Sequence, residues 1–135
     1  MMIFKEIYPA LYKSARILYD ILAERKPREC IRHKTLPSWE EHMKFVLSEP
    51  YYKWYIIYED EEPIGHINLT LDRKVGVFLF ERFRGKGLGE EAIRRLVGLH
   101  PGPLYAEVNP LNAPSIVFFT RLGGKLVQHT YEVIL

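Results

Sequence analysis

Three glycines at alternate positions, Gly85, Gly87 and Gly89, separate a β-forming run from a strong helix former in the stretch ERFRGKGLGEEAIRRLVG. A glycine inside a regular element costs about 0.5–1 kcal/mol relative to alanine, so three of them at a helix start need a reason. A strand, a glycine-rich turn and a helix start together present several backbone N–H groups to a phosphate, and the helix dipole adds partial positive charge. The stretch therefore predicts a phosphate site, with a plain turn as the alternative.

The spacing excludes two phosphate-binding patterns. A P-loop requires Gly-Lys-Ser/Thr after four free positions, which this stretch lacks. The dinucleotide pattern spaces its glycines differently from Gly85-x-Gly87-x-Gly89. Three basic residues of the stretch, Arg82, Arg84 and Lys86, indicate either a local anion site or a solvated charged loop.

The rest of the chain predicts alternating strands and helices without repeats or a linker. Periodicity and turn residues predict strands at 2–8, 54–60, 63–72, 74–80, 104–109 and 125–135, and helices at 9–26, at 38–48, from the glycines to about 100, and at 112–124. Ser38 and Glu41 form a capping-box pattern at the start of the second helix. The order βααβββαβαβ predicts one α/β (α+β) domain over residues 1–135, a mixed sheet covered by helices.

Composition excludes several classes of protein. With 47% hydrophobic and 27% charged residues, the chain has an ordinary globular composition. A net charge of +2 is too small to argue for a nucleic-acid or membrane partner. The lone Cys30 allows no disulfide within the chain and no cysteine-based zinc site, and no apolar run approaches the roughly 20 residues of a membrane span. We expect a cytoplasmic protein without a metal.

Two motifs together resemble those of the GCN5-related N-acetyltransferase (GNAT) family. The residues Arg84-Gly85-Lys86-Gly87-Leu88-Gly89 resemble its acyl-CoA signature, Arg/Gln-x-x-Gly-x-Gly/Ala. The later stretch EVNPLNAPSIVFFTRLGG (107–124) resembles its second motif, in the right order and at about the right distance. The resemblance covers roughly residues 75–125. It implies a GNAT-type, mostly antiparallel central sheet with helices on both faces, and transfer of an acetyl group from acetyl-CoA to a primary amine.

The resemblance also implies which residues hold the cofactor. The pantetheine arm is expected beside the strand residues Val77, Phe78 and Leu79, and beside Asn112, whose alternative role is a helix N-cap. The pyrophosphate is expected on the turn and the helix start, formed by Arg84, Gly85, Lys86, Gly87, Leu88, Gly89 and Glu90.

Three residues, Ser115, Glu107 and His66, are candidates for the chemistry, and Phe119 beside them is expected to contact the cofactor. Phe119 stands where the family commonly has a tyrosine that protonates the departing thiolate, and Ser115 is the alternative acid or simply a residue of the first helical turn. Glu107, five residues before Asn112, matches the general base of one family branch; the alternative is a salt-bridged or rim carboxylate. His66 is the second candidate base, since imidazole titrates near neutrality, or else a structural histidine.

Two further segments bear on the acceptor amine. Residues 33–46 and 54–70 resemble the amino-sugar-nucleotide N-acetyltransferases of bacterial surface-glycan synthesis. A protein amino terminus and a small polyamine stay open as acceptors, and a homodimer is compatible with the sequence. A different class, a CoA-binding module without catalysis, is raised by Phe119, which lacks the hydroxyl group.

Overall fold

The computed structural model describes residues 1–8, 11–26 and 35–135, so Cys30 and the start of the segment 33–46 lie outside the described residues. In this part of the chain one four-stranded antiparallel sheet has the order β1-β2-β3-β4. The elements are β1 (Met2–Glu6), α1 (Leu11–Ala23), α2 (Trp39–Leu47), β2 (Lys53–Glu59), β3 (Glu62–Leu69), β4 (Val75–Leu79), α3 (Leu88–Leu99) and α4 (Ala113–Arg121).

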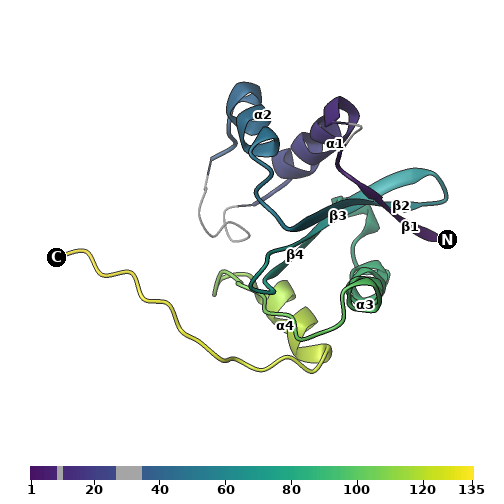
Figure 1. Ribbon diagram of the computed structural model, residues 1–135. Coiled ribbons are helices and arrows are strands. Elements are labelled where there is room, and N and C mark those ends of the chain that lie inside the picture. The colour runs from purple at the N-terminus through teal and green to yellow at the C-terminus, as the bar shows by residue number, and fades with distance from the viewer. Residues whose placement is uncertain (9–10, 27–34) are drawn as a thin grey trace.

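Helices cover both faces of the sheet, α1 and α2 on one and α3 and α4 on the other (Figure 1). The alternation along β2 explains this arrangement, because successive side chains of a strand point to opposite faces. Trp54, Ile56 and Tyr58 pack in a cluster with α1 and α2, whereas Tyr55 and Ile57 pack in a second cluster with α3. The expected fold class, a mostly antiparallel sheet with helices on both faces, is confirmed.

The predicted capping box at α2 is also confirmed. The Glu41 N–H donates to Ser38 Oγ at 3.1 Å, and the Ser38 N–H donates to Glu41 Oε1 at 3.3 Å. These reciprocal bonds satisfy two of the N–H groups that a helix start leaves without an acceptor. A local pattern of four residues therefore fixes where α2 begins.

The prediction of a strand at 104–109 is wrong. Within the described part of the chain, this segment makes one parallel bridge, between Lys74 and Tyr105. The Val75 N–H donates to the Tyr105 carbonyl at 2.8 Å, and the Tyr105 N–H donates to the Arg73 carbonyl at 2.9 Å. Alternation of apolar residues predicts an extended backbone, but a strand also needs a neighbour along its length, and the bridge gives this segment a neighbour at one point.

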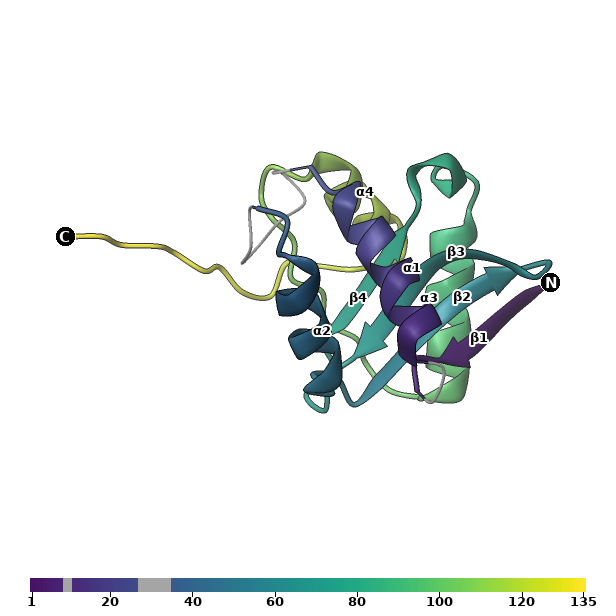
Figure 2. The same ribbon diagram turned by 90° about the horizontal axis from the view of Figure 1, so that it is seen from above.

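The prediction of a strand at 125–135 is wrong for the same reason. The segment is extended, every one of its residues is exposed, and it has no strand assignment. Figures 1 and 2 show it leaving α4 and running away from the rest of the protein in both views. The sequence predicted its extended conformation, whereas strand pairing requires a second segment lying alongside.

Candidate functional site

The three glycines have two different structural roles. Gly85 and Gly87 have φ angles of 74° and 78°, in the left-handed region that glycine adopts without a steric penalty. A Cβ atom added to either would meet nothing within 4 Å, so the space beside them is open. A Cβ at Gly89 would instead lie 3.1 Å from Phe118 Cε1. The first two glycines therefore shape an open turn, and the third lets α3 and α4 pack closely.

The N-terminus of α3 opens onto this turn. Gly87 is its N-cap and supplies no side-chain hydrogen bond to the helix. The first N–H groups of a helix have no acceptor within the helix, so here they are presented to an outside acceptor together with the positive end of the dipole. Glu90 in the first turn is ion-paired to Arg94, with 3.6 Å between Oε2 and Nε. The open turn and the uncapped amides fit a phosphate group.

The three basic residues of the glycine stretch are placed differently from one another. Arg82 Nη2 lies 2.9 Å from Glu62 Oε1 and so pairs with β3. Arg84 Nε donates to the Leu79 carbonyl at 3.3 Å, which braces the turn against the end of β4. Lys86 is exposed, with its Nζ 5.8 Å from the centre of the Phe83 ring. Of these three, Lys86 is best placed to attract an anion to the glycine turn.

The edge strand β4 connects this turn to the sheet. On one side β4 pairs with β3, and on the other side its contact with 104–109 is the bridge at Lys74. Val77 and Leu79 pack against the cluster on the α3 side, whereas Phe78 stacks on His66 across the opposite face, with 4.8 Å between ring centroids. Apart from the Val75 N–H and the Leu79 carbonyl, which are bonded to Tyr105 and Arg84, the outer edge of β4 offers backbone groups to an extended ligand, as a strand edge does.

Arg73 holds 104–109 beside β4, a role that the sequence did not reveal. Its backbone has a φ of 71° in the turn between β3 and β4. Its side chain donates from Nε to the Pro103 carbonyl at 2.9 Å and from Nη2 to the His100 carbonyl at 2.8 Å. These bonds join the end of α3 to the turn. A turn was predicted at residues 72–74, but nothing in the sequence indicates that its arginine reaches a loop 30 residues later.

Glu107 lies at the start of the second motif, on the segment that Arg73 positions. Its side chain is 47% exposed, and its Oε1 lies 3.7 Å from Lys74 Nζ. Glu107 therefore lies at a rim and has a cationic neighbour, the placement of a salt-bridged rim carboxylate. A half-exposed carboxylate can receive a proton from an amine that approaches along β4. The role of Glu107 as a general base stays a prediction.

The side chain of His66, on β3, lies among aromatic rings. Its Nδ1 accepts a hydrogen bond from Trp54 Nε1 at 3.2 Å, and its ring stacks on Phe78. Burial lowers the pKa of His66 to about 3, helped by the charges of Arg25 and His42. Because Nδ1 is an acceptor, the neutral ring carries its proton on Nε2. These features are those of a structural histidine.

The low pKa of His66 predicts that the protein loses stability in mild acid. The unfolded imidazole titrates near 6.5, so between that pH and about 3 the unfolded state binds one more proton than the folded state. The free energy of unfolding should then fall as the pH falls, by up to about 1.4 kcal/mol per pH unit for one proton. Urea unfolding measured at several pH values checks this slope.

His66→Phe should flatten that pH dependence, whatever it does to stability at neutral pH. His129→Phe is the matched control, since His129 is exposed in the segment 125–135 and should leave the slope unchanged. Equal slopes for the wild type and His66→Phe would contradict a neutral His66 with a lowered pKa.

The remaining candidates lie on α4 and at its start. Asn112 Oδ1 accepts from the Ser115 N–H at 3.3 Å, which makes Asn112 the N-cap of α4. Its Nδ2 group is a separate donor, so capping and ligand binding do not compete for one atom. Ser115 is half-buried in the first turn, and Phe119 packs against the core with Phe118, 4.9 Å between ring centroids.

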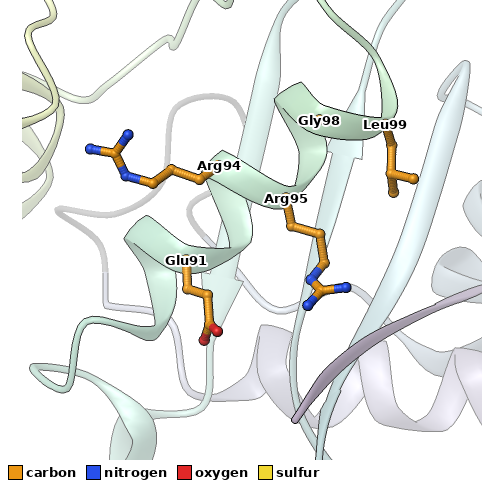
Figure 3. Close-up of a pocket in the computed structure, with 5 residues that line it drawn as sticks. All are labelled: Glu91, Arg94, Arg95, Gly98 and Leu99. Atoms are coloured by element: carbon orange, nitrogen blue, oxygen red, sulfur yellow. The ribbon is translucent and has the colours of Figure 1, made fainter.

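A shallow hollow lies elsewhere, on the exposed side of α3 (Figure 3). It is lined by Glu91, Arg94, Arg95, Gly98 and Leu99, all from this one helix. None of the predicted site residues lines it. The candidate site is therefore the glycine turn with the open edge of β4, and not this hollow.

Comparison with known proteins agrees with the two motifs. The sequence model described as the Acetyltransferase (GNAT) family matches residues 15–124, most of the chain. The chain belongs to the GNAT family. The match includes the glycine turn, α3 and α4, so the elements around the candidate site are those of this family.

Individual relatives of this GNAT chain are distant. Peptidyl-lysine N-acetyltransferase YjaB of Salmonella typhimurium is 29% identical over 73 residues, a match that spans 54% of this chain and 50% of that protein. An acetyltransferase from Thermus thermophilus has a similar structure, with a TM-score of 0.76 at 21% identity over 95% of this chain and 89% of that one.

The same GNAT fold is found in yncA, a putative acetyltransferase from Salmonella typhimurium whose structure contains its cofactor acetyl-CoA. The TM-score is 0.63 at 17% identity, over 91% of this chain and 79% of that one. No helix in the described part of this GNAT chain is long and apolar enough to cross a membrane.

Proposed function

We propose that this GNAT protein transfers the acetyl group of acetyl-CoA to a primary amine by direct attack of the amine. One observation carries the proposal: the turn at Gly85 and Gly87 opens onto the uncapped amides of α3, next to the outer edge of β4. A phosphate acceptor for the amides and an extended amide chain for the strand edge occur together in coenzyme A. The family membership supports the same ligand.

Separate parts of the site would hold separate parts of this cofactor. The N–H groups of residues 85–90 would bind the pyrophosphate, with the exposed Lys86 attracting it. The backbone of Val77–Leu79 would pair with the pantetheine arm, and Asn112 Nδ2 would donate to it. Acetyl-CoA supplies the acetyl group as a thioester, which an uncharged amine can attack.

We assign to Glu107 the role of general base, which removes a proton from the acceptor amine. A lysine-like amine with a pKa of about 10.4 is neutral in roughly one part in 10³ at pH 7, so it must lose a proton near the site. Glu107 is half-exposed beside β4 and can take this proton from the attacking nitrogen. His66 is the weaker candidate, because a ring with a pKa of about 3 holds protons poorly at neutral pH.

The variant Phe119→Tyr tests whether the reaction needs an acid to protonate the leaving thiolate. The C–S bond breaks as the C–N bond forms, and the sulfur leaves as a thiolate that Ser115 or water can protonate. Because a thiol has a pKa of about 8.5, its thiolate leaves without much help. Phe119→Tyr should therefore leave the turnover rate at saturating substrate unchanged. A several-fold gain, with unchanged affinity for acetyl-CoA, would contradict this assignment.

The acceptor that we propose is a nucleotide-linked amino sugar, since residues 33–46 and 54–70 resemble enzymes for such acceptors. A protein lysine side chain is the second candidate, because the relative YjaB is named a peptidyl-lysine N-acetyltransferase. Trp54, Tyr55 and Tyr58 are buried in the two cores, so they cannot stack on a sugar or a base. Just before the second segment, Tyr52 is 53% exposed and is the aromatic residue of 51–58 best placed for such a contact.

An acceptor panel with detection of the released CoA thiol tests the proposal. The panel contains a uridine-linked amino sugar, a lysine peptide with a blocked amino terminus, a peptide with a free amino terminus, and a polyamine. We expect the amino-sugar nucleotide to give the fastest thiol release of the panel. Tight binding of acetyl-CoA without turnover on any amine would favour the alternative of a CoA-binding module.

A further inference from the structure

Asn68, near the end of β3, is a buried polar residue whose amide group is not used by the fold. Its side chain is 5% exposed. Within residues 1–8, 11–26 and 35–135, the amide oxygen and nitrogen of this side chain have no hydrogen-bond partner. A buried amide without a partner costs free energy of folding, so its presence calls for a partner from outside the chain.

The residues next to Asn68 in the sheet do not compete for its amide. In the register of the sheet, Asn68 lies opposite Trp54 on β2 and Gly76 on β4. Trp54 packs in the cluster with α1 and α2, so Asn68 points to the face that these helices cover (Figure 1). The Trp54 N–H is bonded to His66, and Gly76 has no side chain. The amide of Asn68 can therefore bind a ligand that reaches this face.

The amide leans over β4, in the direction of the outer edge of the sheet. A Cβ atom added to Gly76 would lie 3.0 Å from both Asn68 Oδ1 and Asn68 Nδ2. The same Cβ atom would lie 2.9 Å from Phe78 Cε2, so the Phe78 ring borders the same space. The missing side chain of Gly76 thus makes room for the amide above the strand that we assign to the pantetheine arm.

This part of β4 would lie at the acetyl end of the bound cofactor. The glycine turn that would hold the pyrophosphate follows the end of β4, so the pantetheine arm would run back toward the start of the strand, where Gly76 lies. Lys74 is two residues from Gly76 on the same face, about 7 Å along an extended backbone. Lys74 Nζ is 3.7 Å from Glu107 Oε1. Asn68 and the proposed base, Glu107, therefore border the same end of β4.

We propose that Asn68 Oδ1 accepts a hydrogen bond from the attacking nitrogen and so makes the enzyme selective for primary amines. This inference rests on the proposed acetyl transfer and names a residue that orients its acceptor. A neutral primary amine has one lone pair and two N–H groups. With one N–H directed at Glu107 and the other at Asn68, the lone pair is left to point at the thioester carbonyl.

The same arrangement accounts for every bond of the transfer. The C–N bond forms and the C–S bond breaks, and the sulfur leaves as the thiolate. Glu107 takes the proton of the first N–H. The second N–H stays on the product amide, still bonded to Asn68. A secondary amine has a single N–H, so it would leave either Glu107 or Asn68 without its hydrogen bond.

Thiol release with paired amines tests this role. Each amine of the panel is compared with its N-methyl derivative at saturating acetyl-CoA. The wild type should favour the primary amine by at least about tenfold in kcat/KM, and Asn68→Leu should reduce the preference to about twofold or less, because the primary amine loses its bond. Ser14→Ala is the matched control. Ser14 is 6% exposed on α1, over the same face of the sheet, and its variant should keep the preference.

Three further measurements separate this role from a structural one. Asn68→Leu replaces the amide with an apolar group of similar size, so the melting temperature should not fall. The affinity for acetyl-CoA, measured by calorimetric titration, should stay at the wild-type value. Gly76→Ala keeps Asn68 but places a methyl carbon 3.0 Å from its amide, so the amide must move and the preference should fall here too.

The outcomes distinguish the role of Asn68 from the proposed function. A folded Asn68→Leu protein with the wild-type preference for primary amines would overturn the role and leave acetyl transfer standing. A marked loss of thermal stability in Asn68→Leu would also overturn it, because the amide would then have a partner within the protein. A wild type that releases no thiol with any amine would overturn both.

Discussion

Gly87→Val is expected to lower the affinity for acetyl-CoA at least tenfold, which corresponds to about 1.4 kcal/mol. Gly87 has a φ of 78°, a conformation that a β-branched residue rarely adopts, so the turn would have to change. The new side chain would also occupy the open space beside the amides of α3. Calorimetric titration with acetyl-CoA measures the loss, after circular dichroism has verified that the variant is folded.

Gly98→Val is the matched control for this prediction. Gly98 also has nothing within 4 Å of an added Cβ, but it lies in the last turns of α3, away from the glycine turn. The same substitution there should leave the affinity within about twofold of the wild type, well under the tenfold change of 1.4 kcal/mol. An unchanged affinity in a folded Gly87→Val protein would rule out phosphate binding at this turn.

Glu107→Gln is expected to lower the rate at saturating acetyl-CoA by at least about 100-fold at neutral pH, the lower bound for loss of a general base. The amide keeps the shape of the side chain and removes the proton acceptor beside Lys74. The loss should shrink as the pH approaches the pKa of the acceptor amine, since that amine then deprotonates without help. Initial rates across the pH range, with the best acceptor of the panel, measure both effects.

Asp72→Asn is the matched control for the charge change. Asp72 Oδ2 lies 3.8 Å from the same Lys74 Nζ, so this variant also removes a carboxylate next to that cation. It should keep a near-normal rate. A folded Glu107→Gln protein with a near-normal rate at neutral pH would remove Glu107 from the mechanism and leave His66 as the candidate to test. A loss that stays constant with pH would make Glu107 a positioning residue for the amine.

The parts of the fold that were predicted correctly depend on neighbours in sequence. Ser38 and Glu41 fix the start of α2 through two bonds across three residues, and such a pattern can be read without the rest of the chain. The strand–turn–helix unit around Gly85 and Gly87 was predicted for the same reason. The left-handed backbone of these glycines is a local requirement that few other residues meet.

Three features of the candidate site could not be predicted, because each depends on residues distant in sequence. Gly89 is a contact point for Phe118 on α4, although it reads as part of the phosphate motif. Arg73 reaches the loop after α3 and so holds 104–109 beside β4. The pKa of His66 is low because Trp54 and Phe78, from two other strands, enclose its ring.

The sequence by itself determined the family, the order of most elements, and the turn that would receive the cofactor, since motifs, caps and periodicity are local properties of the chain. Only the tertiary structure decided that, among the described residues, 104–109 meets β4 at one bridge and 125–135 belongs to no strand. It also decided that Glu107 lies at a rim beside Lys74 and not within an apolar strand. The physical reason is that alternation specifies an extended backbone, whereas pairing and burial depend on which other segment lies alongside.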